Sequence, residues 1–279
     1  MNHELEGKVA LVTGAASKRG LGHGIALRLA AAGAKLVLLD KYEAPPSYYA
    51  GDEAWRGLQE VVEEITALGQ MAISVKADVS DGRQVSEAVD LGLSTFGRVD
   101  ILVNCAGTVQ NNDMPVAEMN EEEWNRVLGV NLTGAFLVSK AAARDMIRRK
   151  AQGKIVHISS ITGKKGAPGH AAYAASKFGL IGLVQSLALE LAPYKVNVNA
   201  VCPGAIPTNV ADSRDHAESG KTGASVEEIR RKRYERLTFP LARFGTVEDV
   251  AELVLFLVSS RADYITGHDV NITGGLWMS

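Results

Sequence analysis

Tyr173 and Lys177 are the pair of residues in this sequence with the clearest chemical potential. They lie four residues apart in a segment with helical character, and this spacing places two side chains on one face of a helix. A phenol is a poor base at neutral pH, because its unperturbed pKa is about 10. A positive charge held beside it favours the phenolate. The pair therefore predicts a proton-transfer site, although the same spacing taken alone is more common on a plain surface.

A second candidate site is the glycine-rich segment TGAASKRGLG, residues 13–22. Glycines let the backbone turn tightly and approach a pyrophosphate, and the N-terminus of a following helix offers free N–H groups. A glycine-rich turn alone is weak support, since glycine also makes ordinary turns. Its position between the first predicted strand and the first predicted helix favours a dinucleotide site.

Asp40 ends the second predicted strand. A carboxylate at that point accepts hydrogen bonds from the adenosine ribose and repels a 2′-phosphate, which predicts NAD rather than NADP. The alternative is an aspartate that only shapes the next turn. Lys18, Arg19 and Lys41 weigh against NAD, because a cation nearby could hold a 2′-phosphate.

Seven short apolar segments alternate with longer helical ones. The strand candidates are continuously apolar, as in strands covered by helices on both faces. This alternation predicts an α/β fold, a Rossmann-type, doubly wound parallel sheet of about seven strands within a single domain, residues 1–279. The predicted strands are 8–13, 35–40, 71–76, 100–104, 154–159, 195–201 and 268–272, and the predicted helices are 22–32, 81–96, 121–150, 173–192 and 247–258.

Two segments interrupt this rhythm. Residues 41–57 form an expected insertion after the second strand, and residues 207–238 form a polar segment with a charged, helix-like part. Segments of this length inside a compact domain are typically functional. We expect residues 207–238 to be a substrate lid. The basic run from Arg230 to Arg233 is expected to form an ion-paired helix face, with an anion site as the alternative.

Composition excludes several classes of function. A net charge of −2 gives no global reason to bind nucleic acid or an anionic membrane. We expect no membrane span and no secretory signal. Cys105 and Cys202 are expected to be buried free thiols of a cytoplasmic protein. The histidines show no metal-ligand spacing, so no metal is expected, and His157 is predicted to be a hydrogen-bonded core residue.

Over nearly its whole length the chain resembles a classical short-chain dehydrogenase/reductase. The motifs that carry the resemblance are the 13–22 turn, Asp78 with Val79, Asn104 to Gly107, Asn131, Ser160, Tyr173 with Lys177, and Pro203-Gly204 running to Thr208.

The resemblance implies a catalytic role for four residues. Tyr173 would be the acid/base, and Ser160 would hydrogen-bond the substrate oxygen. Lys177 would bind the nicotinamide ribose and bias the tyrosine towards its anion. Asn131 would hold a water that links Lys177 to solvent.

The resemblance also implies a set of cofactor contacts. Asp78 and Val79 would flank the adenine, and the Pro203–Thr208 stretch would seat the nicotinamide carboxamide. The remaining contacts expected from the turn, the second strand and the central strands complete the set. In full, the expected cofactor residues are Gly14, Ser17, Arg19, Gly20, Leu21, Gly22, Asp40, Asp78, Val79, Asn104, Ala106, Gly107, Tyr173, Lys177, Pro203, Gly204, Ile206 and Thr208.

Two segments of the chain are longer than the family pattern. Lys18 and Arg19 make the glycine-rich turn two residues longer than usual. The 41–57 insertion is similar to those of longer family members, in which extra loops cover the adenosine end. Whether it tightens cofactor retention is a hypothesis.

The leading expectation is an oxidoreductase that moves hydride between NAD(H) and a secondary alcohol or ketone. One alternative is an NADPH-dependent 3-oxoacyl-(acyl-carrier-protein) reductase, against which Asp40 weighs. Another is a non-catalytic nucleotide sensor, which has no chemical reason to keep Asn131, Ser160, Tyr173 and Lys177 together. The expected partner is a small-molecule substrate, in a pocket walled by residues 108–114, 163–169 and the lid. The resemblance further implies a homotetramer built through its two longest helices and its C-terminal segment.

Overall fold

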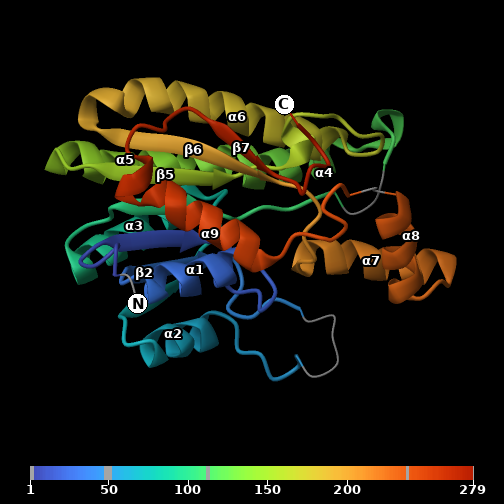
Figure 1. The fold of residues 1–279 in the computed structure, drawn as a ribbon, viewed down its shortest axis with the longest axis horizontal. Coiled ribbons are helices and arrows are strands. Elements are labelled where there is room, and N and C mark those ends of the chain that lie inside the picture. Colours follow the sequence, from blue (N-terminus) through green and yellow to red (C-terminus); the bar gives the residue numbers. More distant parts are fainter. Residues whose placement is uncertain (1–2, 47–51, 111–113, 237–238, 279) are drawn as a thin grey trace.

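Seven strands lie side by side in one parallel sheet in the computed structural model of the chain, which describes residues 3–46, 52–110, 114–236 and 239–278 (Figure 1). The strand order is β3-β2-β1-β4-β5-β6-β7, and every neighbouring pair runs parallel. The predicted Rossmann-type, doubly wound sheet is confirmed. The strands are β1 Val9–Thr13, β2 Lys35–Asp40, β3 Ala72–Lys76, β4 Ile101–Asn104, β5 Gly153–Ile158, β6 Val196–Pro203 and β7 Asp269–Ile272.

The order of strands reverses beside β1. This strand pairs with β2 on one side and with β4 on the other, so that Thr13 lies opposite both Leu39 and Asn104. In open α/β sheets, ligands bind outside the carboxyl ends of the strands at such a switch point. The glycine-rich turn begins directly after Thr13 and therefore occupies this position.

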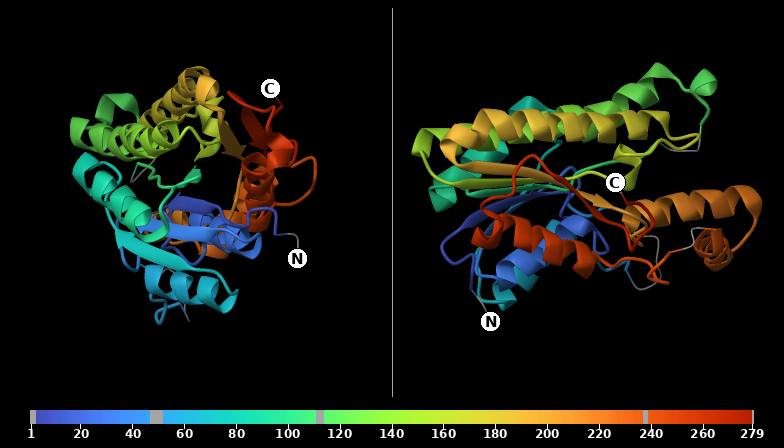
Figure 2. Two further views of the ribbon diagram at one scale, coloured as in Figure 1. Left: turned by 90° about the vertical axis from the view of Figure 1, so that its left-hand side faces the viewer. Right: turned by 45° about the horizontal axis from the view of Figure 1, so that its top comes forward.

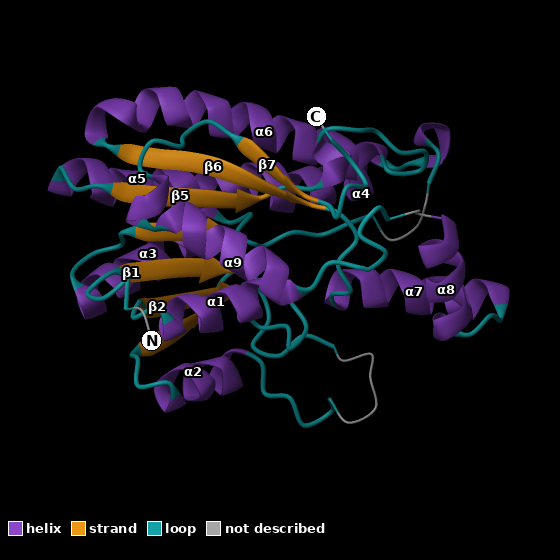
Figure 3. Cartoon of the chain, viewed as in Figure 1, coloured by secondary structure: helices purple, strands orange, loops and turns teal. Residues whose placement is uncertain are grey.

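Helices cover both faces of the sheet (Figure 2). One face carries α1 Leu21–Ala31, α2 Leu58–Ala67 and α9 Val247–Val258. The other carries α3 Gly82–Phe96, α5 Gly134–Arg149 and α6 Ala171–Leu191, with α4 Glu121–Leu128 leading into α5. The strands point toward the side of the molecule where α7 Asn209–Thr222 and α8 Val226–Arg236 lie (Figure 3).

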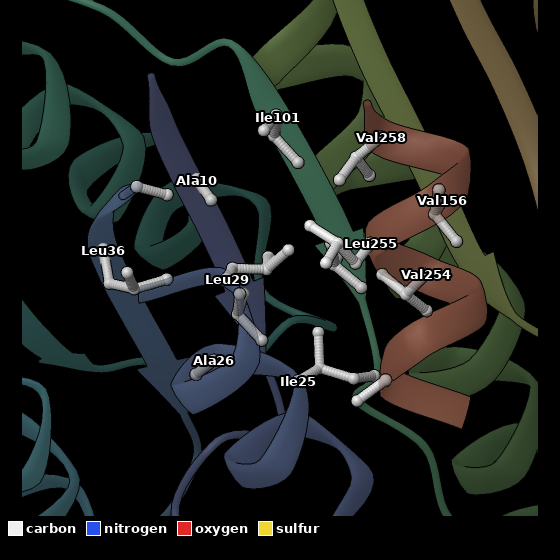
Figure 4. Packing of buried hydrophobic residues seen from close by; sticks show 14 of the residues in the cluster. Ala10, Ile25, Ala26, Leu29, Leu36, Ile101, Val156, Val254, Leu255 and Val258 are labelled. Atoms are coloured by element: carbon white, nitrogen blue, oxygen red, sulfur yellow. The ribbon is translucent and has the colours of Figure 1, made fainter. Parts of the chain in front are cut away.

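The alternation of side chains along each strand feeds two separate cores. Ala10 and Val12 belong to the cluster under α1 and α9, whereas Val9 and Leu11 belong to the cluster under α3, α5 and α6. Figure 4 shows the first of these cores, where side chains from α1 and α9 meet the sheet. Because both faces are buried, the strands are apolar at successive positions, as the sequence indicates.

The structure corrects three expectations about helices. Residues 121–150 are not one continuous helix, because a π-helical turn, Gly129–Thr133, separates α4 from α5. Helix α2 follows the insertion at residues where we predicted no helix. The 207–238 segment contains two helices, α7 and α8, of which only the second corresponds to the expected charged stretch.

Helix α6 is long and strongly apolar. With the turn that follows, residues Ala171–Tyr194, it is long and apolar enough to cross a membrane by length and composition alone. It is nevertheless the crossover between β5 and β6, and Val184, Ala188 and Leu191 are buried in the core beneath it. An apolar helix in this position is a core helix of the parallel sheet.

Candidate active site

The turn between β1 and α1 has the shape of a phosphate cradle. Gly14 has a φ of +70°, and a Cβ there would lie 2.9 Å from the amide nitrogen of Ala106. A Cβ on Gly22 would lie 2.2 Å from the Gly14 carbonyl oxygen. Helix α1 begins at Leu21, and no side chain among the described residues caps its N-terminus. Its first N–H groups and its dipole therefore suit an anion, so the turn fits a dinucleotide pyrophosphate.

Asp40 lies beside this turn, as predicted from the end of β2. Its Oδ2 accepts a hydrogen bond from the Ala16 N–H at 3.0 Å, and its Oδ1 accepts one from the Tyr42 N–H at 3.0 Å. Burial raises the pKa of the Asp40 carboxyl, although these backbone hydrogen bonds oppose the rise. The carboxylate is thus fixed at the place where an adenosine ribose would approach.

Asp78 and Val79 follow β3 on the same edge of the sheet. Asp78 forms an ion pair with Lys41 at 2.9 Å and accepts a hydrogen bond from the Ser80 hydroxyl at 2.7 Å. Burial acts to raise the pKa of Asp78, but the bonds from Ser80 and Lys41 outweigh it and the pKa is lowered. Val79 is buried against the start of α5, where a Cβ on Gly134 would lie 2.8 Å from its side chain.

The two extra residues of the turn contact the insertion. Lys18 and Arg19 both form ion pairs with Asp52, at 2.8 and 3.2 Å. Trp55 donates a hydrogen bond from Nε1 to the Ala16 carbonyl at 2.8 Å. Arg19, which we expected to contact the cofactor, has its guanidinium group on Asp52 in this structure. Residues 47–51 of the insertion lie outside the described residues.

Asn104 has a different position from the one expected of a residue lining the cleft. It is 2% exposed, and its Oδ1 accepts a hydrogen bond from the Thr13 hydroxyl at 2.7 Å. Its Nδ2 lies 3.3 Å from His157 Nδ1, and His157 Nε2 lies 3.0 Å from the Ser139 hydroxyl. Asn104 therefore joins three strands and α5 through a buried polar chain. His157 is a hydrogen-bonded core residue, as predicted.

The residues after Asn104 bring the backbone to the catalytic candidates. The N–H groups of Cys105 and Ala106 donate to the Thr13 hydroxyl at 3.1 and 3.0 Å. A Cβ on Gly107 would lie 3.4 Å from Asn131 Oδ1 and 3.6 Å from Lys177 Nζ. Cys105 and Cys202 are both free, as predicted, but only Cys202 is fully buried and Cys105 is half-buried.

Tyr173 and Lys177 lie on one face of α6, as their spacing predicts. Lys177 Nζ is 5.7 Å from the centre of the Tyr173 ring and donates a hydrogen bond to the Ile158 carbonyl at 2.8 Å. Burial lowers the pKa of Lys177 to about 8. The arrangement keeps an ammonium group next to the phenol, where its charge favours the phenolate.

Asn131 lies in the π-helical turn between α4 and α5 and is fully buried. Its Oδ1 accepts from the Thr108 N–H at 2.8 Å, and its Nδ2 donates to the Thr108 carbonyl and to the Ser176 hydroxyl, each at 2.9 Å. Ser176 in turn donates to the Tyr173 carbonyl at 2.7 Å. Such turns occur frequently at functional sites, because they displace a side chain from the regular helical register.

Ser160 follows β5 and lies at the same edge of the sheet. Its hydroxyl oxygen accepts a hydrogen bond from the Thr162 N–H at 3.0 Å, at the start of a short turn, Ile161–Gly163. The neighbouring Ser159 is directed elsewhere, since its hydroxyl donates to the Lys177 carbonyl at 3.2 Å. The Ser159 hydroxyl is therefore engaged by α6, and the assignment of Ser160 to the substrate oxygen stays a prediction.

The Pro203–Thr208 stretch continues from β6 into α7. The Gly204 N–H donates to the Ile272 carbonyl at 3.0 Å, which holds the stretch against β7. Ile206 is 9% exposed, and a Cβ on Gly245 would lie 2.4 Å from its Cδ1. Thr208 is the N-cap residue of α7, so this stretch links the sheet to the expected lid.

Two contacts at this edge were missed from the sequence. The Tyr173 N–H donates to Gln110 Oε1 at 3.3 Å, and Gln110 Nε2 donates to the Gly169 carbonyl, so Gln110 joins two of the expected pocket walls. In the expected lid segment, Arg230 of α8 forms ion pairs with Asp212 and Asp215 of α7 at 2.5 and 2.9 Å. No pattern in the sequence pairs these residues. Residues 111–113 and 237–238, which we assigned to the pocket wall and the lid, lie outside the described residues.

Comparisons with known proteins agree on one family. Residues 14–277 match the family described as enoyl-(acyl carrier protein) reductase. The chain is 38% identical over 271 residues to a protein named 3-oxoacyl-(acyl-carrier-protein) reductase from Staphylococcus aureus, with 97% of this chain and 98% of that protein covered. It is 39% identical over 278 residues to the protein of the same name from Aquifex aeolicus, with 99% and 100% covered.

A solved structure shows the same fold. A short-chain type dehydrogenase/reductase from Mycobacterium marinum superposes with a TM-score of 0.83 at 31% identity, covering 100% of this chain and 98% of that one. The expected resemblance is confirmed along the whole chain. The chain belongs to the short-chain dehydrogenase/reductase family and is an oxidoreductase.

Proposed function

We propose that this oxidoreductase reduces the ketone of a 3-oxoacyl group carried by acyl carrier protein. The similarity to relatives named for that reaction, at 38% and 39% identity over nearly the entire chain, carries the proposal. Of the two substrate classes expected from the sequence, it favours the alternative over a free secondary alcohol.

We assign the proton chemistry to Tyr173. The phenol donates a proton to the ketone oxygen, and the Lys177 ammonium beside the ring stabilises the phenolate that remains. Ser160 holds the substrate oxygen by a hydrogen bond from its hydroxyl. Asn131 fixes the Thr108 backbone and Ser176 around α6, and through them it positions the tyrosine.

A nicotinamide dinucleotide fits the cradle at the β1–α1 turn, and when bound it supplies the hydride. Gly14, Gly20 and Gly22 leave room for its pyrophosphate, and Asp40 receives the adenosine ribose. Lys177 and the Pro203–Thr208 stretch hold the nicotinamide end. We propose NAD(H) as the preferred form, because the Asp40 carboxylate repels a 2′-phosphate.

Asp40 also supports a second candidate, an NAD-linked dehydrogenase of a free secondary alcohol. The purified chain, assayed by NADH and NADPH absorbance, separates the two. It is offered acetoacetyl-acyl carrier protein, a free acetoacetyl thioester, and a panel of sugars, polyols, hydroxysteroids and cyclic alcohols. The proposal expects the carrier-bound ketone to be reduced with the highest kcat/KM. Turnover restricted to a free alcohol with NAD would replace it with the second candidate.

The domain organisation, the location in the cell and the oligomeric state expected from the sequence are also proposals. We propose that residues 1–279 act as one cytoplasmic domain with residues 207–238 as its substrate lid. We also propose a homotetramer. Exposed apolar side chains on the two longest helices support it, with Phe136 on α5 45% exposed and Leu189 on α6 80% exposed.

A further inference from the structure

Two departures from the family's usual lengths meet in the structure. Lys18 and Arg19 are the two residues by which the glycine-rich turn is extended, and Asp52 belongs to the 41–57 insertion. Lys18 Nζ lies 2.8 Å from Asp52 Oδ1, and the Arg19 Nε and Nη2 atoms each lie 3.2 Å from Asp52 Oδ2. The Asp52 side chain is about 10% exposed, so both cations are held by one largely buried carboxylate.

Trp55 closes this group, and we call Lys18, Arg19, Asp52 and Trp55 the turn clasp. Lys18 Nζ lies 5.8 Å from the centre of the Trp55 ring, within range of a cation–π contact. The backbone N–H of Trp55 donates to the Asp52 carbonyl at 3.0 Å, which fixes the two insertion residues relative to each other. The clasp is therefore an ordered contact between the turn and the insertion.

The turn clasp adjoins the proposed ribose site through one residue. The Ala16 N–H donates to the Asp40 carboxylate at 3.0 Å, while the Ala16 carbonyl accepts from Trp55 Nε1 at 2.8 Å. Lys18 and Arg19 follow Ala16 by only two and three residues. The two cations are thus next to the position where a 2′-phosphate would lie.

Each of the three cations expected to favour a 2′-phosphate is engaged by an acidic side chain. Asp52 binds Lys18 and Arg19, and Asp78 binds Lys41 at 2.9 Å. A phosphate carrying about two negative charges would meet the Asp40 carboxylate and would have to displace Asp52 to obtain a cation. Discrimination against a 2′-phosphate would then combine repulsion by Asp40 with the engagement of the nearby cations by other carboxylates.

We propose that Asp52 is a specificity-determining residue that excludes 2′-phosphorylated dinucleotides by holding Lys18 and Arg19. The inference rests on the proposed nicotinamide cofactor and adds to Asp40 a second determinant, supplied by the insertion. Asp52 acts through the two cations and touches no part of the ribose itself.

Equilibrium binding tests this without a substrate. Calorimetry measures the Kd values of NAD⁺, NADP⁺, 5′-AMP and adenosine 2′,5′-bisphosphate for the wild-type chain and for Asp52→Asn, which keeps the side-chain shape. We expect Asp52→Asn to raise the affinity for NADP⁺ relative to NAD⁺ by at least about tenfold, or about 1.4 kcal/mol. The 2′,5′-bisphosphate should gain over 5′-AMP by a similar factor, and the gain should shrink at high salt.

Four further variants identify the cause of the gain. Asp52→Glu retains the charge and should stay close to wild type. Lys18→Met with Arg19→Met in the Asp52→Asn background should abolish the gain, because the freed cations are then absent. Glu87→Gln removes an exposed carboxylate of α3 that pairs with Arg83, and so controls for the change in net charge. Asp52→Ser is measured alongside, so that a folding defect in one variant leaves the other to decide.

The outcomes separate this inference from the function on which it rests. An unchanged NADP⁺ to NAD⁺ ratio in folded Asp52→Asn and Asp52→Ser, with NAD⁺ still bound, overturns the inference alone. Equal changes for both dinucleotides also overturn it, since they would place the effect of Asp52 on a part that NAD⁺ and NADP⁺ share, such as the pyrophosphate. A wild-type chain that binds neither dinucleotide contradicts the proposed function and the inference with it.

Discussion

At the scale of single residues, the site depends on charged and polar groups held where water is excluded. His157 is the extreme case, because burial, assisted by the nearby Lys177 charge, lowers its pKa to about 3. Its two ring nitrogens face Asn104 and Ser139 in the chain that joins β1, β4 and β5 to α5. The imidazole is therefore neutral in the folded protein throughout the ordinary pH range.

This burial predicts how stability depends on acid. Between pH 3 and pH 6.5 the unfolded chain binds a proton on His157 that the folded chain does not. The free energy of unfolding therefore decreases as the pH falls through this window. The contribution has a slope of up to about 1.4 kcal/mol per pH unit. Urea titrations at several pH values should show a shallower acid dependence for His157→Gln than for wild type.

The control for this measurement is His3→Gln, which removes an imidazole that is more than half exposed. It should leave the acid dependence of the free energy of unfolding as in wild type. Equal slopes for wild type and His157→Gln would mean that His157 takes up a proton without cost in the folded state.

Lys177 predicts a second pH effect, this time on the reaction. Because burial lowers its pKa to about 8, the ammonium that we propose to stabilise the Tyr173 phenolate loses its charge above that pH. Ketone reduction should therefore be steady below pH 8 and fall above it. Lys177→Arg, whose guanidinium stays charged, should keep whatever activity it has to higher pH. A wild-type profile that stays flat to pH 9.5 would contradict this role.

Sequence alone predicted some of these residues and missed others, for a physical reason. The Tyr173–Lys177 pair and Asp40 were predictable because their positions follow from helical spacing and from the end of a strand. Asp52 and Gln110 were not, because their partners lie in segments distant in sequence, and no local periodicity encodes which loops meet. Asn131 was predicted from the family motif, but its π-helical turn was not, since the flanking residues read as one helix.

At the scale of elements, Arg230 links the two helices of the proposed lid, α7 and α8. Arg230 of α8 binds Asp212 and Asp215 of α7, and both aspartates are 1% exposed. The expectation of an ion-paired face is confirmed for Arg230 and for Lys232, which pairs with Glu228 at 2.9 Å. The partners of Arg230, however, lie on α7 and not on its own helix.

Breaking the ion pairs of Arg230 should loosen the proposed lid without unfolding the sheet. Arg230→Met removes a cation that two buried carboxylates share, and removing one partner of a buried ion pair typically costs about 3–5 kcal/mol. We expect faster hydrogen exchange in α7 and α8, a higher KM and little change in α1 or α6. Lys232→Met, which breaks a more exposed pair on the same helix, is the matched control. Exchange rates in α7 equal to those of wild type would show that the pair does not hold the lid.

At the scale of the whole molecule, the parallel sheet was predictable and its edge contacts were not. A strand buried on both faces consists of consecutive apolar residues, as in Leu36–Leu39 of β2. The alternation of such strands with helices implies right-handed crossovers. Helix α2 was missed because the polar, proline-bearing insertion just before it hides its beginning. The loops at the carboxyl edge come from distant parts of the chain, and the pattern of strands does not predict which of them are in contact.

The carboxyl edge of the sheet brings Tyr173, Lys177 and Asn131 beside the switch point next to β1. The most direct test of it is Tyr173→Phe, a change that removes one hydroxyl and leaves the ring. Stopped-flow or steady-state NADH absorbance gives the reduction rate, and calorimetry gives the Kd for NAD⁺. We predict a loss of at least about a hundredfold in kcat, in keeping with a lost proton donor, with NAD⁺ binding nearly unchanged. Reduction at the wild-type rate in this variant would show that the Tyr173 hydroxyl does not supply the proton.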